Sequence, residues 1–144
     1  MRYDRFHGIA VLEPEVAGWV TDSLPDLRSQ VVNQIHYEFD GWLGDALLES
    51  FPCWIVIISG KAAIQLGGFT GVTFGDSEVS PSHQFKDLYP DRKLPRFAWL
   101  KVHGTAGRND FGISPNHILV VSERALNVLQ GFGIDHAEIR AFQG

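Results

Sequence analysis

Histidine, aspartate and glutamate side chains are the groups in this sequence that could hold a metal ion, and their spacing does not favour one. Zinc and similar ions are commonly bound by ligands a few residues apart on one element, completed by a second such pair. Apart from Asp135–His136, no histidine has another His, a Cys or clustered carboxylates at ligand spacing. We therefore predict no metal site, and one could form only if the fold brought three ligands together. The six histidines are His7, His36, His83, His103, His117 and His136.

Two serines and one cysteine are the candidate nucleophiles. Ser59 and Ser122 each follow an apolar, β-branched run, which is the strand-turn-helix position of a hydrolase nucleophile, but both lack the flanking glycines of a G-x-S-x-G elbow. We interpret both as helix N-caps, because the first N–H groups of a helix need acceptors. Cys53 stands alone beside Trp54 in an apolar run, which predicts a buried hydrophobe and excludes an internal disulfide. No catalytic residue is predicted.

A polar stretch in the second half of the chain offers an alternative site. Gly104 and Gly107 lie within it, but they match no phosphate-loop or dinucleotide fingerprint, so we predict no cofactor. His103, Arg108 and Asp110 are the candidate polar groups there. They could serve a small hydrolase or transferase, with a site at the junction of two repeated units, if they converge within hydrogen-bonding reach in a pocket.

Aromatic and acidic residues are mixed in the turn-rich stretch 39–49. An aromatic anchor surrounded by polar groups suits a protein interface. We therefore predict a partner-binding surface made of Asp40, Trp42, Asp45 and Glu49, with burial of the tryptophan as the alternative.

Composition narrows the class of protein. A chain of 144 residues with 44% hydrophobic and 20% charged residues is typical of one globular domain, here 1–144. The net charge of −5 and the scattered basic residues argue against a nucleic-acid surface and fit a basic partner or solubility alone. No apolar run reaches the roughly 20 residues that span a bilayer, and the N-terminal segment does not read as a signal peptide. We expect a cytoplasmic protein without membrane contact.

An internal repeat predicts the elements that position these residues. The segment 52–69 aligns with the segment 115–132, and seven of the aligned pairs are identical. These pairs are Pro52/Pro115, Ile55/Ile118, Ser59/Ser122, Ala62/Ala125, Leu66/Leu129, Gly68/Gly131 and Phe69/Phe132. Such self-similarity indicates a duplicated unit, here covering 41–75 and 104–142. Each unit reads as strand, helix and strand. The fold class is therefore α/β, with α+β as the alternative, in which two such units form a mixed sheet covered by short helices.

Hydrophobic periodicity indicates the individual elements. Strands are expected at 54–58, 118–121 and 137–142, with helices capped by Ser59 and Ser122. The inward face of the first helix is expected to carry Ala62, Leu66 and Phe69, and that of the second Ala125, Val128, Leu129 and Phe132. Further strands are expected at 8–12, from 72 onward and at 96–102, a helix at 26–35, a short helix at 46–49 capped by Asp45, and one turn at 85–88.

The last third of the chain resembles a bacterial immunity-protein-like family of unknown function. The resemblance rests on Asp110-Phe111, the strand 118–121, the run Val121-Ser122-Glu123-Arg124, the short helix after it, Gly131 and the strand 137–142. Gly112 stands where the family has an arginine. The resemblance implies a small cytoplasmic α/β protein that binds and neutralises a toxin, and it implies no catalytic residues.

These observations lead to three hypotheses for function. The first is a non-enzymatic protein-binding module of the immunity type that binds a cognate, basic toxin. The second is the small hydrolase or transferase described above. The third is a homodimeric scaffold that pairs through an exposed sheet edge.

Overall fold

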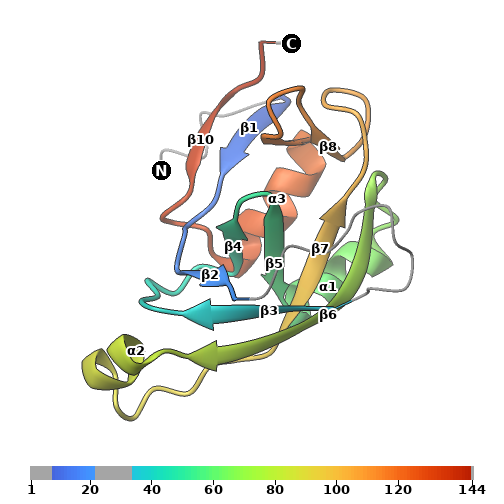
Figure 1. The fold of residues 1–144 in the computed structure, drawn as a ribbon. Coiled ribbons are helices and arrows are strands. Elements are labelled where there is room, and N and C mark those ends of the chain that lie inside the picture. Colours follow the sequence, from blue (N-terminus) through green and yellow to red (C-terminus); the bar gives the residue numbers. More distant parts are fainter. Residues whose placement is uncertain (1–7, 22–33, 144) are drawn as a thin grey trace.

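Two sheets and three helices make up the part of the chain that the computed structural model describes, residues 8–21 and 34–143 (Figure 1). The four-stranded sheet has the order β10 (Glu138–Ala141), β1 (Ala10–Glu13), β9 (Leu119–Val121), β8 (Phe111–Ile113). The six-stranded sheet has the order β2 (Gly18–Val20), β3 (Gln34–Phe39), β6 (Val72–Pro81), β7 (Phe97–Val102), β5 (Cys53–Ile57), β4 (Leu47–Ser50). The helices are α1 (Ile58–Leu66), α2 (His83–Leu88) and α3 (Glu123–Phe132).

Mixed α/β content is confirmed, whereas the single mixed sheet is wrong. Only the six-stranded sheet is mixed, because β3 pairs with β6 in parallel while the other neighbouring strands in both sheets are antiparallel. Two sheets form because the strands of the two units pair with different partners: β5 and β6 with β7, and β9 and β10 with β1.

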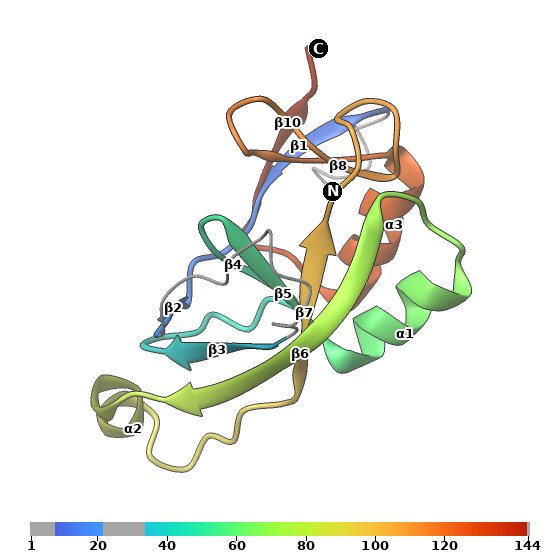
Figure 2. The ribbon, with the colours of Figure 1, turned by 45° about the vertical axis from the view of Figure 1, so that its right-hand side comes forward.

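The two predicted units have the same strand order around their helices. One runs β4, β5, α1, β6, and the other runs β8, β9, α3, β10. In each unit the two strands that flank the helix are parallel, but one antiparallel strand lies between them, β7 in the first unit and β1 in the second. The expected crossover to an adjacent parallel strand is therefore wrong. The helices of the two units, α1 and α3, contact each other and lie side by side in Figure 2.

The helix starts show that the alignment of Ser59 with Ser122 does not pair equivalent positions. Ser122 caps α3 as predicted, since its Oγ accepts a hydrogen bond from the backbone N–H of Ala125 at 3.1 Å. The residue before α1 is Ile57, which makes no side-chain cap, so the prediction that Ser59 caps this helix is wrong. The position equivalent to Ser122 is therefore Ile57, two places before Ser59.

This shift places the wrong residues on the inner face of α1 in the sequence prediction. Ala62 is exposed and Leu66 is 90% exposed, whereas Gly60 and Ile64 are buried. Phe69, which lies beyond the end of α1, packs against the first core, so its inward position is confirmed. In α3 the predicted face is largely right: Ala125 and Leu129 are buried and Val128 packs against the core, while Phe132 is 37% exposed.

Two hydrophobic cores lie on opposite faces of β4, β5 and β7. On β5, Trp54 and Val56 face the first core, and Cys53 and Ile55 face the second, as the alternation of a strand requires. The first core fills the space between the two sheets, α1 and α3. The second lies within the curved six-stranded sheet, which nearly closes on itself because the segment before β2 reaches β4 through a bridge between Glu15 and Leu48. Most of β5 and β7 and the start of β4 are therefore buried on both faces.

Several other predictions can be compared directly. The strands at 8–12, from 72 onward and at 96–102 and the turn at 85–88 are confirmed within about two residues as β1, β6, β7 and α2. The short helix at 46–49 is wrong, because β4 covers Leu47–Ser50 and sends Leu47 and Leu48 into different cores. Most of the helix at 26–35 lies outside the described residues, and its last two positions begin β3.

Candidate functional site

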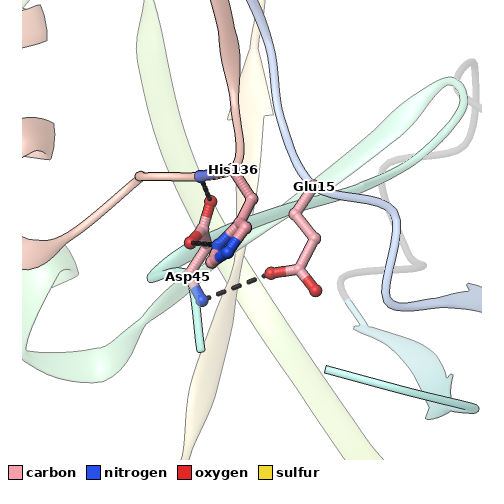
Figure 3. A group of neighbouring side chains, drawn as sticks. All are labelled: Glu15, Asp45 and His136. Carbon is pink, nitrogen blue, oxygen red and sulfur yellow. Dashed lines mark hydrogen bonds and ion pairs between the residues drawn. The ribbon is translucent and has the colours of Figure 1, made fainter. Parts of the chain in front are cut away.

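Glu15, Asp45 and His136 form a cluster of titratable side chains from three separate segments (Figure 3). Glu15 lies between β1 and β2, Asp45 in the loop before β4, and His136 between α3 and β10. One oxygen or nitrogen atom of each side chain lies within 4.8 Å of those of the other two. Glu15 and Asp45 are only 7% and 2% exposed, whereas His136 is exposed. The two carboxylates are therefore interior groups that need partners.

Each carboxylate oxygen of the cluster accepts a hydrogen bond. The Asp45 Oδ1 atom lies 2.7 Å from His136 Nδ1, and Asp45 Oδ2 accepts the backbone N–H of His136 at 2.9 Å. The Glu15 Oε2 atom accepts the backbone N–H of Leu43 at 2.7 Å, and Oε1 that of Asp45 at 3.3 Å. Because the carboxylate of Asp45 can only accept while it is ionised, the imidazole proton sits on Nδ1.

Burial and hydrogen bonding shift the pKa values of this cluster. Burial raises the pKa of Glu15, against the opposing effect of the N–H groups of Leu43 and Asp45. The hydrogen bond to Asp45 raises the pKa of His136 above its ordinary value. A protonated His136 then forms an ion pair with Asp45 that connects the α3–β10 turn to the loop before β4.

The cluster is better suited to holding the chain together than to holding an ion. Two carboxylates and one imidazole are ligand types for divalent cations. Each of their oxygens is already engaged by an N–H group, and Nδ1 of His136 would have to lose its proton and its bond to Asp45 before it could bind an ion. We therefore interpret the cluster as a structural one that fixes the position of the loop before β4, and we name Glu15, Asp45 and His136 the clamp.

The clamp holds a surface loop, residues 40–45, which we name the Leu43 loop. The N–H groups of Asp40 and Gly41 donate to the backbone oxygen of Ala17 at 2.9 and 3.1 Å. The indole Nε1 of Trp42 donates to the backbone oxygen of Asp45 at 3.0 Å. From outside the loop, Arg92 donates to the backbone oxygen of Trp42 at 2.8 Å, and its guanidinium lies 4.4 Å from the centre of the indole ring. The loop is therefore held at both ends and in the middle.

Of the predicted partner-binding surface, Trp42 and Asp45 are not exposed, and the alternative of a buried tryptophan is confirmed. Trp42 is 9% exposed and packs edge-on against Phe39 and Phe97, and Asp45 is buried in the clamp. Glu49 is partly buried, accepts a hydrogen bond from Trp54 Nε1 at 3.1 Å, and has a pKa that burial raises. Asp40 is half-buried at the start of the Leu43 loop. Trp42 and Asp45 thus hold the loop from inside, whereas Glu49 lies on β4 and binds Trp54. Local sequence patterns could not indicate the burial of Asp45, because its partner His136 is distant in the chain.

Apolar side chains occupy the exposed positions in this region. Val16, next to Glu15, is 67% exposed, and Leu43, whose N–H is held by Glu15, is 62% exposed. Trp19, on the edge strand that continues from this segment, is 46% exposed. Isolated exposed apolar residues are common. Here, however, Val16 and Leu43 lie on two segments that the buried carboxylate of Glu15 joins.

The alternative polar site does not assemble in the described part of the chain. Asp110 receives hydrogen bonds from the Thr70 N–H at 3.0 Å and the Ser122 hydroxyl at 2.7 Å, and it pairs with Arg124 at 3.3 Å. Burial works against ionisation, but these donors and the arginine together lower the pKa of Asp110. Neither His103 nor Arg108 makes a hydrogen bond or ion pair with it there, and both are exposed. Asp110 instead joins the start of α3 to the end of α1.

A separate cavity of about 300 Å³ lies where the two units meet. It is bounded by the turn after β4, the C-terminal half of β7, and β8 with the loop that follows it. Its lining residues are Pro52, Cys53, Trp54, Thr73, Trp99, Leu100, Lys101, Val102, His103, Ile113 and His117. His103 of the predicted polar site lines this cavity, whereas Arg108 and Asp110 do not. Burial of Cys53 is confirmed and raises its pKa to about 11, which makes the thiol a poor nucleophile.

Comparison with known proteins adds no assignment. No protein-family model matches the chain, and no protein of curated function is significantly similar to it in sequence. The resemblance to immunity proteins therefore remains a prediction. Among the described residues, no helix is long and apolar enough to cross a membrane.

Proposed function

We propose that this chain is a non-enzymatic protein-binding module of the immunity type, whose binding face consists of residues 14–19 and the Leu43 loop. The observation that carries the proposal is the buried carboxylate of Glu15, which holds the N–H groups of Leu43 and Asp45 while the Leu43 side chain stays 62% exposed.

The energetics of the clamp support a role in binding. A buried ionised carboxylate is unfavourable by several kcal/mol unless hydrogen bonds compensate for the lost water. Here the compensating bonds go to a surface loop, so the interior charge serves to hold that loop in one conformation. A loop that is already ordered loses less conformational entropy when a partner binds. An apolar side chain on such a loop is a suitable anchor for a protein interface.

The surrounding charges indicate a basic partner. Asp40 begins the Leu43 loop, Glu38 lies opposite Trp19 on the neighbouring strand, and Asp135 precedes His136 of the clamp. With the net charge of −5, these carboxylates favour encounter with a cationic protein surface. The partner we expect therefore offers an apolar socket with a basic rim, as a cognate toxin of basic character would.

Affinity capture with surface variants tests this function. The tagged chain is incubated with host lysate and with the products of neighbouring genes, beside Leu43→Arg and the control Leu66→Arg. Leu66 is 90% exposed at the end of α1, outside residues 14–19 and the Leu43 loop, so it controls for a new surface arginine. We expect one stoichiometric partner that the wild type and the control retain and Leu43→Arg loses.

Two results count against the proposal. A partner captured equally by Leu43→Arg would place binding elsewhere, and capture of no partner would remove support for a binding module. The mass of the isolated chain in solution is measured in parallel. A homodimer that Leu43→Arg dissociates would show that the face binds a second copy instead.

We also infer that the two units descend from one duplicated hairpin, helix and strand. The strand order that the two units share supports this inference. When the helix starts define equivalent positions, the buried residues Val56 and Val121 match, and so do Ile64 and Leu129. Related sequences test the inference. Similarity between the two units should appear in the alignment that pairs Ile57 with Ser122, and similarity confined to the alignment that pairs Ser59 with Ser122 would contradict it.

A further inference from the structure

We propose that strand β10 pairs with β10 of a second copy of this chain, so that two four-stranded sheets join across a two-fold axis. The inference goes beyond the protein-binding function and does not depend on it, because β10 contributes no residue to the Leu43 face. It assigns a particular edge to the homodimer that the sequence offered as one hypothesis. Two features carry it: the open edge of β10 and the order of charges along this strand.

Three of the four sheet edges are already engaged. At β8, the N–H of Ile113 donates to the backbone oxygen of Gly104 at 3.0 Å. At β2, the N–H of Val20 donates to the hydroxyl of Ser50 at 3.1 Å, which joins this edge to β4 at the other end of the same sheet. In the part of the chain that the structure describes, β10 is therefore the edge that remains (Figure 1).

The pairing of β10 with β1 shows which backbone groups point to the open edge. The N–H of Phe142 donates to the backbone oxygen of Ile9 at 3.0 Å, and residues at intervals of two before Phe142 likewise bond to β1. Ile139 and Ala141 therefore direct their N–H and C=O groups away from β1. Neither N–H donates to another described residue. Unpaired backbone groups on a sheet edge are a template for adding a strand.

The charges on β10 indicate that the added strand is a second copy. Glu138 and Arg140 are exposed on one face, on either side of Ile139, whose side chain packs against the first core on the other face. Arg140 pairs with Glu13 of β1, whereas Glu138 lies directly opposite Glu13. Like charges at opposite positions of a sheet are unfavourable, and Glu138 forms no ion pair with a described residue. Glu138 is thus an exposed carboxylate to which a partner strand could offer a cation.

Antiparallel pairing centred on Ile139 supplies that cation. When Ile139 of one copy lies opposite Ile139 of the other, Glu138 of each copy lies opposite Arg140 of the other. The N–H and C=O groups of the two Ile139 residues then bond to each other, and the charged residues occupy the non-hydrogen-bonded positions, where side chains are closer. A two-fold interface repeats each contact, so the ion pair forms twice. Because the shared edge is short, we expect a weak dimer.

Charge reversal on either side of the ion pair tests the proposal by sedimentation equilibrium, with protein concentrations up to about 1 mM. The wild type should dimerise. Glu138→Arg and Arg140→Glu should each weaken self-association at least about tenfold, because like charges then lie opposite each other twice. An equal mixture of the two variants should associate again, since the edge of one is basic and that of the other acidic.

Controls separate this edge from general charge effects and from the Leu43 face. Asp91→Arg and Lys93→Glu make the same changes in net charge at exposed residues outside β10 and should dimerise like the wild type. Leu43→Arg should also dimerise normally. Ala141→Pro removes an N–H that faces the open edge and keeps the bonds to β1, so it should weaken the dimer without a change of charge. Only variants with wild-type circular dichroism are compared.

Four results would each overturn the proposal. The first is a wild type that stays monomeric up to the highest concentration. The second is a dimer that Glu138→Arg, Arg140→Glu and Ala141→Pro leave unchanged, which would place the interface elsewhere. The third is a mixture of the two charge-reversed variants that does not associate although the wild type does. The fourth is a dimer that Leu43→Arg dissociates, which would assign self-association to the Leu43 face.

Discussion

Replacing Glu15 by glutamine removes the buried charge beneath the Leu43 loop while keeping the shape of the side chain. The wild-type carboxylate accepts N–H groups from Leu43 at 2.7 Å and Asp45 at 3.3 Å. A glutamine can accept only one of them well, because its NH₂ group must face the other. The variant therefore has one weakened hydrogen bond and one buried N–H group that meets a donor.

The size of the effect follows from these two changes. When the Leu43 N–H donates to a neutral acceptor instead of a charged one, the free energy of unfolding falls by about 1 kcal/mol. Leaving the Asp45 N–H without an acceptor lowers it further by about 1–3 kcal/mol. Removing the buried charge next to Asp45 offsets part of this, since burial and the Asp45 carboxylate both raise the pKa of Glu15. We expect a net loss of about 2 kcal/mol in the free energy of unfolding, which lowers Tm by about 6–8 °C in a domain of this size.

Urea and thermal unfolding at neutral pH measure this loss against a control on the neighbouring strand β1. Glu13 lies at the end of β1, is partly exposed, and forms an ion pair with Arg140 on the surface. Glu13→Gln should lose no more than about 0.5 kcal/mol, as expected for exposed pairs. If Glu15→Gln is as stable as Glu13→Gln, the carboxylate does not act as a clamp and the argument for an ordered Leu43 loop is refuted.

Three further predictions concern the helices and the histidine of the clamp. In urea unfolding, Leu129→Ala should lower the free energy of unfolding by about 2–5 kcal/mol, because this side chain is fully buried. Leu66, which the sequence alignment pairs with Leu129, is exposed, so Leu66→Ala should change the free energy of unfolding by less than about 0.5 kcal/mol. Equal losses in the two variants would support the sequence alignment against the one set by the helix starts. Ser122→Ala should lower the free energy of unfolding by about 1–2 kcal/mol, because it removes the helix cap and the hydrogen bond to Asp110. Ser59→Ala should change it almost not at all, and a large loss there would contradict the helix start at Ile58. Because the pKa of His136 is raised in the folded state, its ion pair with Asp45 contributes most below the ordinary pKa of 6.5 and is lost as pH rises through the folded value. The stability difference between the wild type and His136→Gln, measured from pH 5.5 to 9, should therefore shrink as pH rises, and a constant difference would show that protonation has no part in the clamp.

Local patterns predicted the elements that depend on neighbouring residues. The strand at 96–102 and the helix from Ser122 to Phe132 were found because alternation, a cap and the helical spacing of Ala125 and Leu129 are all local signals. The start of α1 was misplaced because no cap marks it: β5 stays paired with β7 as far as Ile57, and the helix begins immediately after that pairing ends. Tertiary pairing decided that boundary.

The candidate site could not be predicted, because its partners lie far apart in the chain. Asp45 and His136 are 91 residues apart, and Glu15 and Asp45 are 30 apart. A carboxylate in a turn-rich segment normally indicates an exposed residue, so Asp45 was placed on the surface together with Trp42. Asp45 is interior because His136 from another segment supplies its partner, and Trp42 is interior because it packs against Phe39 and Phe97. The predicted surface and the Glu15–Asp45–His136 cluster share Asp45, but the apolar side chains that face solvent in this region, Val16 and Leu43, were not predicted.

Hydrogen–deuterium exchange of the captured complex tests the binding face most directly. The free protein and the complex are compared peptide by peptide, with the Leu43→Arg variant as the reference for lost binding. We predict that the partner slows exchange in residues 14–19 and 40–45 and leaves the cavity segment 99–103 and the loop 114–118 unchanged. Protection confined to that cavity, or no change in residues 14–19 and 40–45, would contradict a binding function for the Leu43 face.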